Sequence, residues 1–229
     1  MNVRQLEGRS LKYVVVEPDD YRRGADYPMV VLLHGYGSDM VNFAGLTPTI
    51  DRERFVYALP NAPISLDLGY GAAGYAWSEP LDAAFDEDGS AEAEVGEFID
   101  ELMELYQVGP GNIVLGGFSQ GGMMAYRHGL PRPEVFRGVM ALSARIPDRD
   151  DMQALLPAQR DQDVFISHGT LDALIPLVDA RGSCRFLEAY GYKPELHEYE
   201  MAHQITAEVV TDIAAWLKRV LPTAGGVSK

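Results

Sequence analysis

The chain has 229 residues, of which 47% are hydrophobic and 23% are charged. This composition is that of a globular protein and excludes a disordered, collagenous or coiled-coil chain. Nineteen basic residues against 34 acidic ones give a formal net charge of −15. Because such a field repels phosphate backbones and anionic lipid headgroups, we expect no nucleic-acid partner and no stable membrane anchoring.

The negative charge is concentrated in one third of the chain. Residues 55–126 contain no lysine or arginine but twelve carboxylates, most of them on a loop from Glu79 to Asp88 and on the helix predicted after it. A solvated acidic face is the ordinary explanation of such a run. The segment Asp86-Glu87-Asp88-Gly89 lacks the spaced ligands of a calcium loop, so we expect no metal there.

The cysteine content, the N-terminal residues and the length of the apolar runs predict the cellular compartment. Cys184 is the only cysteine, so an intrachain disulfide cannot form and a reducing compartment is expected. The first ten residues lack the apolar core of a signal peptide, and the strongly apolar run 29–33 is too short to cross a bilayer. We predict a soluble, unprocessed, cytoplasmic protein.

Short β-branched runs alternate with longer segments of helical period along the chain. Strands are predicted at 12–17, 29–34, 55–59, 112–118, 136–142, 163–168 and 195–200, with 2–6 as a candidate edge hairpin. Helices are predicted at 93–106, 120–128, 178–190 and 206–221. This alternation predicts an α/β fold, with a mostly parallel twisted sheet covered by helices on both faces. No boundary divides residues 1–229, so we predict one domain.

Two segments do not fit this pattern. Residues 64–89 mix glycines with Tyr70, Tyr75 and Trp77, a combination too flexible for a regular element and too aromatic for a plain linker. We expect this segment to form a lid or a pocket wall. Residues 223–229 are expected to be a flexible tail.

Gly117-Phe118-Ser119-Gln120-Gly121 matches the G-x-S-x-G motif between an apolar strand and a helical run. The motif demands a sharp strand-to-helix turn, which forces the serine into a strained backbone conformation. Glycines two residues before and after it avoid a collision between strand and helix. The five-residue match alone occurs by chance in many proteins, but its context predicts Ser119 as a nucleophile.

A serine nucleophile requires a base and an acid elsewhere in the chain. Asp172 lies in the turn that follows strand 163–168, and His203 follows strand 195–200, so both are expected at the carboxyl edge of the sheet. The order Ser119, Asp172, His203 is that of the α/β-hydrolase triad. Two backbone N–H groups, of Tyr36 in the loop after strand 29–34 and of Gln120, are predicted to form the oxyanion hole.

The other four histidines have structural explanations. His34 and His168 end strands near the site, and His168 could alternatively contact substrate or orient Asp172. His197 lies among glutamates on a solvated strand face, and His128 is placed as a favourable cation at a helix C-terminus.

Taken together, these motifs resemble the phospholipase/carboxylesterase family that includes the acyl-protein thioesterases. The resemblance runs over nearly the whole chain and is carried by Leu33-His34-Gly35, Asn61-Ala62-Pro63, Tyr75-Ala76-Trp77, the segment 117–122, His168-Gly169 with Asp172 and Pro176, and His203. It implies hydrolysis of esters or thioesters through an acyl-enzyme, without metal or cofactor, by Ser119, Asp172 and His203. It also suggests a homodimer.

The substrate prediction rests on departures from that family. Tyr36 stands where the thioesterases carry leucine, and the Gly- and Tyr-rich segment replaces a longer apolar lid. We therefore predict a serine carboxylesterase acting on small-molecule esters of short to medium chain length. The residues predicted to line its pocket are Tyr36, Tyr75, Trp77, Met123, Leu171 and Ile175.

Arg145, at the catalytic edge, is either a contact for an anionic substrate group or a solvated, salt-bridged residue. The alternative functions are an acyl-protein thioesterase or lysophospholipase for longer chains, an acyltransferase with the same triad, and a non-catalytic binding module.

Overall fold

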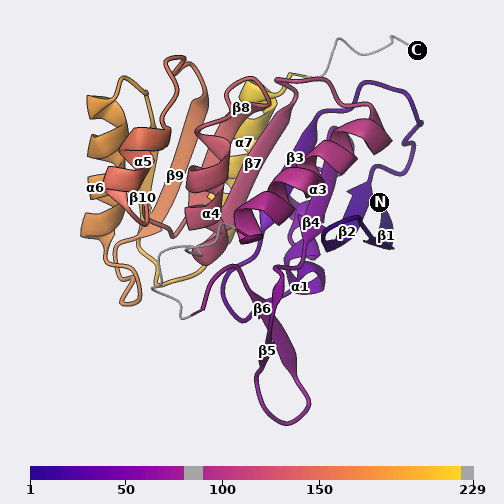
Figure 1. Ribbon diagram of the computed structural model, residues 1–229, viewed down its shortest axis with the longest axis horizontal. Helices are drawn as coiled ribbons and strands as arrows, with labels where there is room; N and C mark the ends of the chain where they lie inside the picture. The colour runs from indigo at the N-terminus through magenta and orange to yellow at the C-terminus, as the bar shows by residue number, and fades with distance from the viewer. Residues whose placement is uncertain (80–89, 223–229) are drawn as a thin grey trace.

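The structure is a computed structural model that describes residues 1–79 and 90–222. An eight-stranded sheet with the order β1-β2-β4-β3-β7-β8-β9-β10 runs through the molecule (Figure 1). Its strands are β1 (Asn2–Glu7), β2 (Lys12–Glu17), β3 (Met29–Leu33), β4 (Val56–Pro60), β7 (Ile113–Phe118), β8 (Phe136–Leu142), β9 (Asp163–Gly169) and β10 (Glu195–Tyr199). The six strands from β4 to β10 in this order are parallel, and only the β1–β2 and β2–β4 pairs are antiparallel. The mostly parallel sheet and the hairpin at its edge are confirmed.

Helices cover both faces of this sheet, as predicted. The helices on one face are α3 (Ser90–Tyr106), α4 (Gln120–Gly129), α5 (Arg149–Leu155) and α6 (Leu177–Ala189). The helices on the other face are α1 (Met40–Ala44), α2 (Thr47–Ile50) and α7 (Ala207–Val220). The short helices α1, α2 and α5 were not predicted, because four to seven residues are too few for a helical period to stand out.

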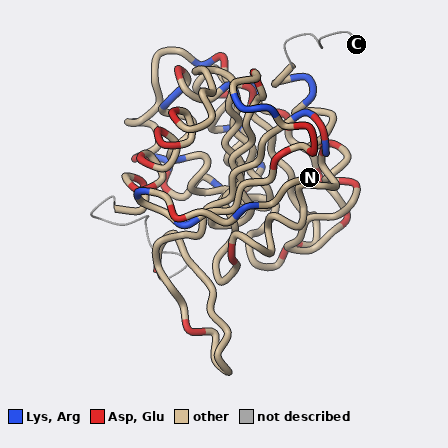
Figure 2. The backbone as a smooth tube through the Cα atoms, turned by 90° about the vertical axis from the view of Figure 1, so that its right-hand side faces the viewer, with Lys and Arg blue, Asp and Glu red and all other residues tan. Residues whose placement is uncertain are grey.

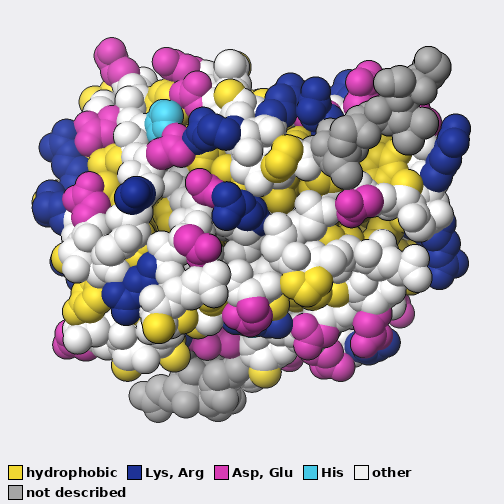
Figure 3. All heavy atoms as spheres, turned by 90° about the horizontal axis from the view of Figure 1, so that it is seen from above, with side chains coloured by type: hydrophobic (Ala, Val, Ile, Leu, Met, Phe, Trp, Pro, Cys, Tyr) yellow, Lys and Arg dark blue, Asp and Glu magenta, His cyan; other side chains and the backbone are white. Residues whose placement is uncertain are grey.

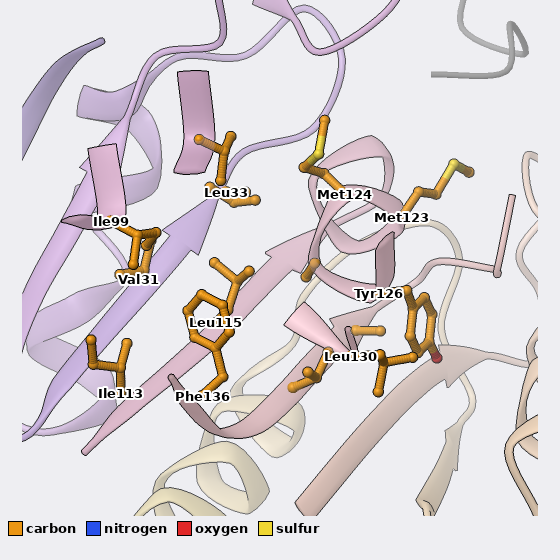
Figure 4. Packing of buried hydrophobic residues seen from close by; sticks show 14 of the residues in the cluster. Val31, Leu33, Ile99, Ile113, Leu115, Met123, Met124, Tyr126, Leu130 and Phe136 are labelled. Atoms are coloured by element: carbon orange, nitrogen blue, oxygen red, sulfur yellow. The ribbon is translucent and has the colours of Figure 1, made fainter. Parts of the chain in front are cut away.

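The alternation of side chains along each inner strand divides the core into two clusters. Val31, Leu115 and Val139 face α3 and α4, whereas Val30, Val114 and Met140 face α7. Figure 4 shows the first cluster, where Ile99 of α3 and Met124 of α4 meet strand residues such as Val31 and Leu115. Both faces of the inner strands are buried, which explains their nearly continuous apolar sequence.

The acidic helix α3 is partly neutralised by arginines from outside the acidic segment. Arg9 Nη2 lies 2.6 Å from Glu104 Oε2, and Arg132 Nη2 lies 3.2 Å from Asp100 Oδ1. Arg127 pairs with Glu92. Figure 2 shows acidic segments next to basic ones on the backbone, and Figure 3 shows side chains of both charges interspersed over the edge seen from above. The acidic face is therefore solvated at its rim and paired with cations at several positions.

Residues 64–76 form a hairpin, which corrects the prediction that this segment lacks regular structure. Strands β5 (Ile64–Asp67) and β6 (Ala73–Ala76) pair antiparallel, and the hairpin projects away from the sheet (Figure 1). Its turn has a positive φ at Gly69, Tyr70 and Gly71. The glycines that suggested flexibility thus serve a tight reversal, for which their conformational freedom is needed. The rest of the predicted lid, 80–89, and the predicted tail, 223–229, lie outside the described residues.

No helix among residues 1–79 and 90–222 is long and apolar enough to cross a membrane.

Candidate active site

Ser119 occupies a sharp turn between β7 and α4. Its backbone has φ 54° and ψ −120°, in a region that residues other than glycine rarely adopt. A Cβ on Gly117 would lie 2.3 Å from the carbonyl carbon of Gly121, and one on Gly121 would lie 2.2 Å from Leu33 O. The predicted need for glycine on both sides of the serine is therefore confirmed: strand, helix and the end of β3 approach too closely for a side chain.

Asp172 and His203 come together at the carboxyl ends of β9 and β10. His203 Nδ1 donates to Asp172 Oδ2 over 2.7 Å. The second oxygen, Oδ1, accepts hydrogen bonds from the amides of Leu174 and Ile175, both 2.9 Å long. The aspartate side chain is fully buried, while the His203 side chain keeps 16% of its surface exposed. The carboxylate is thus fixed by the backbone of its own turn and holds one nitrogen of the histidine.

His168 is the third group at this carboxylate. Its Nε2 donates to Ile175 O over 2.7 Å and lies 3.4 Å from Asp172 Oδ2, and the side chain is fully buried. A side chain without exposed surface cannot contact a substrate. The contacts favour the alternative in which His168 helps to hold the turn that carries Asp172.

The loop after β3 lies against Ser119. A Cβ on Gly35 would lie 3.3 Å from the Cβ of Ser119, so the backbone passes directly beside the serine. Tyr75 of β6 pairs with this loop, since Gly37 N donates to Tyr75 O and Tyr75 N donates to Ser38 O, each over 2.9 Å. Gly74 makes this pairing possible, because a Cβ there would lie 2.4 Å from Gly37 O.

Gln120 is the first residue of α4, where backbone N–H groups have no partner within the helix. Its side chain is buried and bonds the segment after the hairpin: Oε1 accepts from Trp77 N over 2.8 Å, and Nε2 donates to Ser78 O over 2.9 Å. The side chain of Gln120 therefore joins the hairpin to the turn that carries Ser119. Sequence reasoning considered only its backbone and missed this contact.

Ser119 and His203 line one cavity of about 460 Å³. Tyr36, the predicted source of an oxyanion donor, lines it too. The other lining residues are Gly35, Ser38, Asn42, Phe43, Phe118, Leu174, Gln204 and Ile205. Phe118 and Gln204 are next to Ser119 and His203 in the sequence and could have been found by that adjacency, whereas Asn42 and Phe43 belong to the unpredicted helix α1.

The predicted pocket residues other than Tyr36 do not line this cavity. Trp77 is fully buried and donates from Nε1 to His34 O over 2.9 Å, so its prediction as a substrate contact is wrong. Met123 is also buried and belongs to the first core cluster (Figure 4). An aromatic or apolar residue near a catalytic motif in sequence can serve the core as well as the pocket, and only packing distinguishes the two.

The remaining predicted contacts lie around the site. Tyr75 lines a separate cavity of about 310 Å³ next to Asn61. Leu171 is 62% exposed, while Ile175 is buried and contributes its backbone to the Asp172 turn. Arg145 Nη1 donates to Pro147 O over 2.9 Å, and its guanidinium is not brought to the cavity.

Burial sets the charge of two histidines near the catalytic elements. It lowers the pKa of His34, against a smaller opposing effect of the hydrogen bond to Gly35 O. It also lowers the pKa of His128 to about 4, with the nearby Arg132 as the second cause. The expectation that His128 is a cation at the end of α4 is therefore wrong: it is a neutral acceptor for the Arg132 guanidinium at 3.0 Å.

Within residues 1–79 and 90–222, no group of three or more His, Cys, Asp or Glu side chains is arranged to hold a metal ion.

Comparison with known proteins gives the family. The model of the phospholipase/carboxylesterase family matches residues 13–221. The chain is 32% identical to acyl-protein thioesterase 1 of Mycosarcoma maydis, over 93% of this chain and 98% of that protein. Acyl-protein thioesterase 1 of Kluyveromyces lactis is 29% identical, with 84% and 92% covered.

Solved structures agree with this assignment. The crystal structure of esterase PE8 superposes with a TM-score of 0.80 at 29% identity, covering 93% of this chain and all of that one. The Bacillus cereus carboxylesterase has the same fold, with a TM-score of 0.76 at 20% identity over 93% of this chain and 95% of that one. The chain belongs to the phospholipase/carboxylesterase family of α/β-hydrolases, and it is a serine hydrolase.

Proposed function

We propose that this enzyme is a carboxylesterase that hydrolyses neutral esters of short to medium chain length through an acyl-enzyme on Ser119. One observation carries the proposal: Ser119, in its strained turn at the start of α4, lines the same cavity as His203, whose Nδ1 is bonded to the buried Asp172. A serine, a histidine and a buried carboxylate in this relation are the elements that acyl transfer requires.

The proposed mechanism follows from which ring nitrogen of His203 is hydrogen-bonded to Asp172. Because Asp172 holds the Nδ1–H of His203, Nε2 is free to accept the proton of Ser119 Oγ as that oxygen attacks the ester carbonyl. The carbonyl oxygen becomes an oxyanion, which the N–H groups of Tyr36 and Gln120 stabilise. The intermediate expels the alcohol, which takes the proton from Nε2. Water then attacks the acyl-enzyme in the same way, releases the acid and restores Ser119.

The cavity supports a neutral substrate. Phe43, Phe118 and Ile205 give it apolar walls, and the lining residues that the structure describes include no lysine, arginine, aspartate or glutamate. A volume of about 460 Å³ lies at the lower end of the range for small-molecule pockets, roughly 300–1,000 Å³. An anionic substrate would meet no lysine or arginine among the described lining residues and would approach a protein of formal charge −15.

A second candidate is a thioesterase for longer acyl groups. It is favoured by the curated relatives, which carry the name acyl-protein thioesterase 1, one of them at 32% identity. The same triad serves either reaction, since a thioester differs from an ester only in its leaving atom. Comparing kcat/KM for matched nitrophenyl esters and acyl thioesters from C2 to C16 separates the candidates.

We expect the proposed carboxylesterase to prefer oxygen esters and short to medium chains. A maximum at C12 or longer, or a clear preference for the thioester, would favour the second candidate. The nucleophile is tested with a fluorophosphonate probe, which should label the wild-type protein and leave Ser119→Ala unlabelled. Labelling that persists in that variant would assign the nucleophile to another residue.

We also propose a cytoplasmic location. Cys184 is the only cysteine of the chain and its thiol is free and buried, so the fold relies on packing without disulfides. Cell fractionation that recovers the activity with a periplasmic or secreted marker would contradict this.

A further inference from the structure

His34 is a buried histidine whose two ring nitrogens both have backbone partners. Nδ1 lies 2.8 Å from Gly35 O, and Nε2 lies 3.0 Å from Ala62 N. A carbonyl can only accept a hydrogen bond and an amide N–H can only donate one. The ring must therefore carry its proton on Nδ1 and leave Nε2 free to accept. Only the neutral imidazole in one tautomer satisfies both contacts.

The bond from Nδ1 acts on the peptide between Gly35 and Tyr36. In a planar trans peptide the C=O of one residue and the N–H of the next point in opposite directions. A donor that holds Gly35 O on one side therefore fixes the Tyr36 N–H on the other. Ser38 N also donates to Gly35 O, over 3.1 Å, which holds the same carbonyl from the loop itself.

The peptide between Gly35 and Tyr36 lies beside Ser119, so the direction of its N–H group matters for the site. Gly35 lies so close to Ser119 that an added Cβ would be 3.3 Å from the serine Cβ, and both Gly35 and Tyr36 line the cavity. The Tyr36 N–H is thus carried by a backbone segment beside the nucleophile. A rotation of that peptide plane would move the N–H without removing it.

The imidazole is itself held by contacts from distant segments. Ala62 N donates to Nε2 of the ring, and Trp77 Nε1 donates over 2.9 Å to the backbone carbonyl of His34, which holds the main chain that carries the ring. Beside Ala62, Asn61 Oδ1 accepts from Met40 N over 2.7 Å and fixes the far end of the same loop. The ring therefore has a fixed position from which to direct Gly35 O.

We propose that His34 is a positioning residue for oxyanion binding, whose Nδ1–H holds the Gly35–Tyr36 peptide plane so that the Tyr36 N–H faces the substrate carbonyl oxygen at Ser119. The inference rests on the proposed function, because only a reaction that develops an oxyanion at Ser119 uses this amide. A buried histidine with a purely structural role would affect stability. A positioning residue affects the transition state more than the bound substrate.

The test uses substitutions that separate the two nitrogens. His34→Asn places an amide nitrogen where Nδ1 stands and keeps a donor for Gly35 O. His34→Gln places its amide near Nε2, so it keeps an acceptor for Ala62 N and loses that donor, and His34→Leu loses both. The matched control is His128→Leu, at a partly buried histidine outside the cavity. Each variant is measured for kcat and KM on a short nitrophenyl ester and for affinity to a trifluoromethyl ketone, which forms an oxyanion on the nucleophile.

We expect His34→Gln and His34→Leu to lose about 10- to 100-fold in kcat with little change in KM, less than the roughly 10²- to 10³-fold cost of removing a donor outright. Their affinity for the ketone should fall by the same factor as kcat/KM. His34→Asn should keep activity near that of the wild type, and His128→Leu should change neither measurement. If His34→Leu does not fold, the Asn and Gln variants decide the question.

Ketone affinity that is unchanged in His34→Gln, or a His34→Asn variant as impaired as His34→Gln, overturns the inference. If the wild-type protein is labelled at Ser119 in that case, the proposed function stands. A wild-type protein that neither is labelled at Ser119 nor binds the ketone overturns both.

Discussion

The two sides of the cavity are built in different ways. On the triad side, comprising Ser119, Asp172 and His203 with their turns, each residue directly follows β7 or lies a few residues beyond β9 or β10, and Asp172 is bonded by amides two and three residues away. On the oxyanion side, comprising loop 34–40 and the segments that bond it, the hydrogen-bond partners of the loop are 21, 28 and 43 residues distant. The Asp172 carboxylate is thus held largely by its own turn and meets a distant residue only at His203, whereas the bonds that hold loop 34–40 come from distant segments.

This difference predicts different responses to mutation. A change on the triad side should alter the chemistry and leave the fold intact, because these turns are also held by backbone hydrogen bonds that the substituted side chains do not make, such as Ser119 N to Leu142 O over 2.8 Å and Leu171 N to Met201 O over 3.1 Å. A change on the oxyanion side should act indirectly, because both proposed donors are backbone groups and their direction depends on side chains elsewhere. The following predictions test this distinction, from the largest expected effect to the smallest.

Asp172→Asn should lower kcat by about 10⁴-fold with the fold intact. The amide keeps the size of the carboxylate but cannot hold the Nδ1–H of His203 in the same tautomer or stabilise the imidazolium. Single-turnover kinetics measure the loss of activity, and a thermal unfolding curve shows whether the fold is intact. A loss below tenfold would mean that the carboxylate does not support His203 in the reaction. It would contradict the expectation that a change on the triad side acts on the chemistry.

Acid should destabilise the fold through His34 and His128, whose pKa values are lowered by desolvation in the folded protein. The pKa of His128 is about 4 in the folded protein and about 6.5 when unfolded, so below pH 6.5 the unfolded state binds more protons. The stabilisation is complete above pH 6.5 and is lost as the pH falls towards 4, a change of about 3 kcal/mol in the free energy of unfolding.

Urea unfolding of the wild type and His128→Gln between pH 4 and 7 measures this contribution. The variant should lose most of that acid dependence, since glutamine does not titrate. What remains includes His34 on the oxyanion side, whose pKa is also lowered by burial. Identical pH profiles for the two proteins would contradict the assignment to His128.

Gly74→Ala should lower kcat/KM by about tenfold or more, within the roughly 10²- to 10³-fold attributable to one oxyanion donor. The new Cβ would lie 2.4 Å from Gly37 O, so β6 must move away from the loop that it pairs with. Gly109→Ala is the matched control, because nothing lies within 4 Å of its Cβ position. Equal kcat/KM values for the two variants would show that the hairpin does not hold the oxyanion side.

Arg145→Ala should change kcat/KM by less than about twofold, for neutral and for carboxylate-bearing esters alike, because the guanidinium is bonded to Pro147 O and does not line the cavity. A selective loss on carboxylate-bearing esters would restore its predicted contact with an anionic group and would require the side chain to swing into the site.

The success of sequence reasoning followed the same division. The inner strands of the main sheet and the long helices were predictable because they present a hydrophobic pattern. The positions of Ser119, Asp172 and His203 at the carboxyl edge of the sheet were predictable because each lies in a turn after such a strand, and their roles remain a prediction. The helix α1, the hairpin β5–β6 and the buried position of Trp77 were not predicted. Short elements are not long enough to show a hydrophobic period, and the sequence does not distinguish an aromatic residue in a pocket wall from one in the core.

The sequence by itself determined the order of the main-sheet strands and the long helices, the family resemblance, the candidate nucleophile with its acid and base, and the excess of negative charge. Tertiary structure alone decided which side chains line the cavity and which hold it. It also gave His34 a single neutral tautomer, made His128 an acceptor instead of a cation, and joined the Gln120 side chain to the hairpin. The reason is physical: burial, tautomer and peptide orientation depend on partners tens of residues away, which a local pattern does not contain.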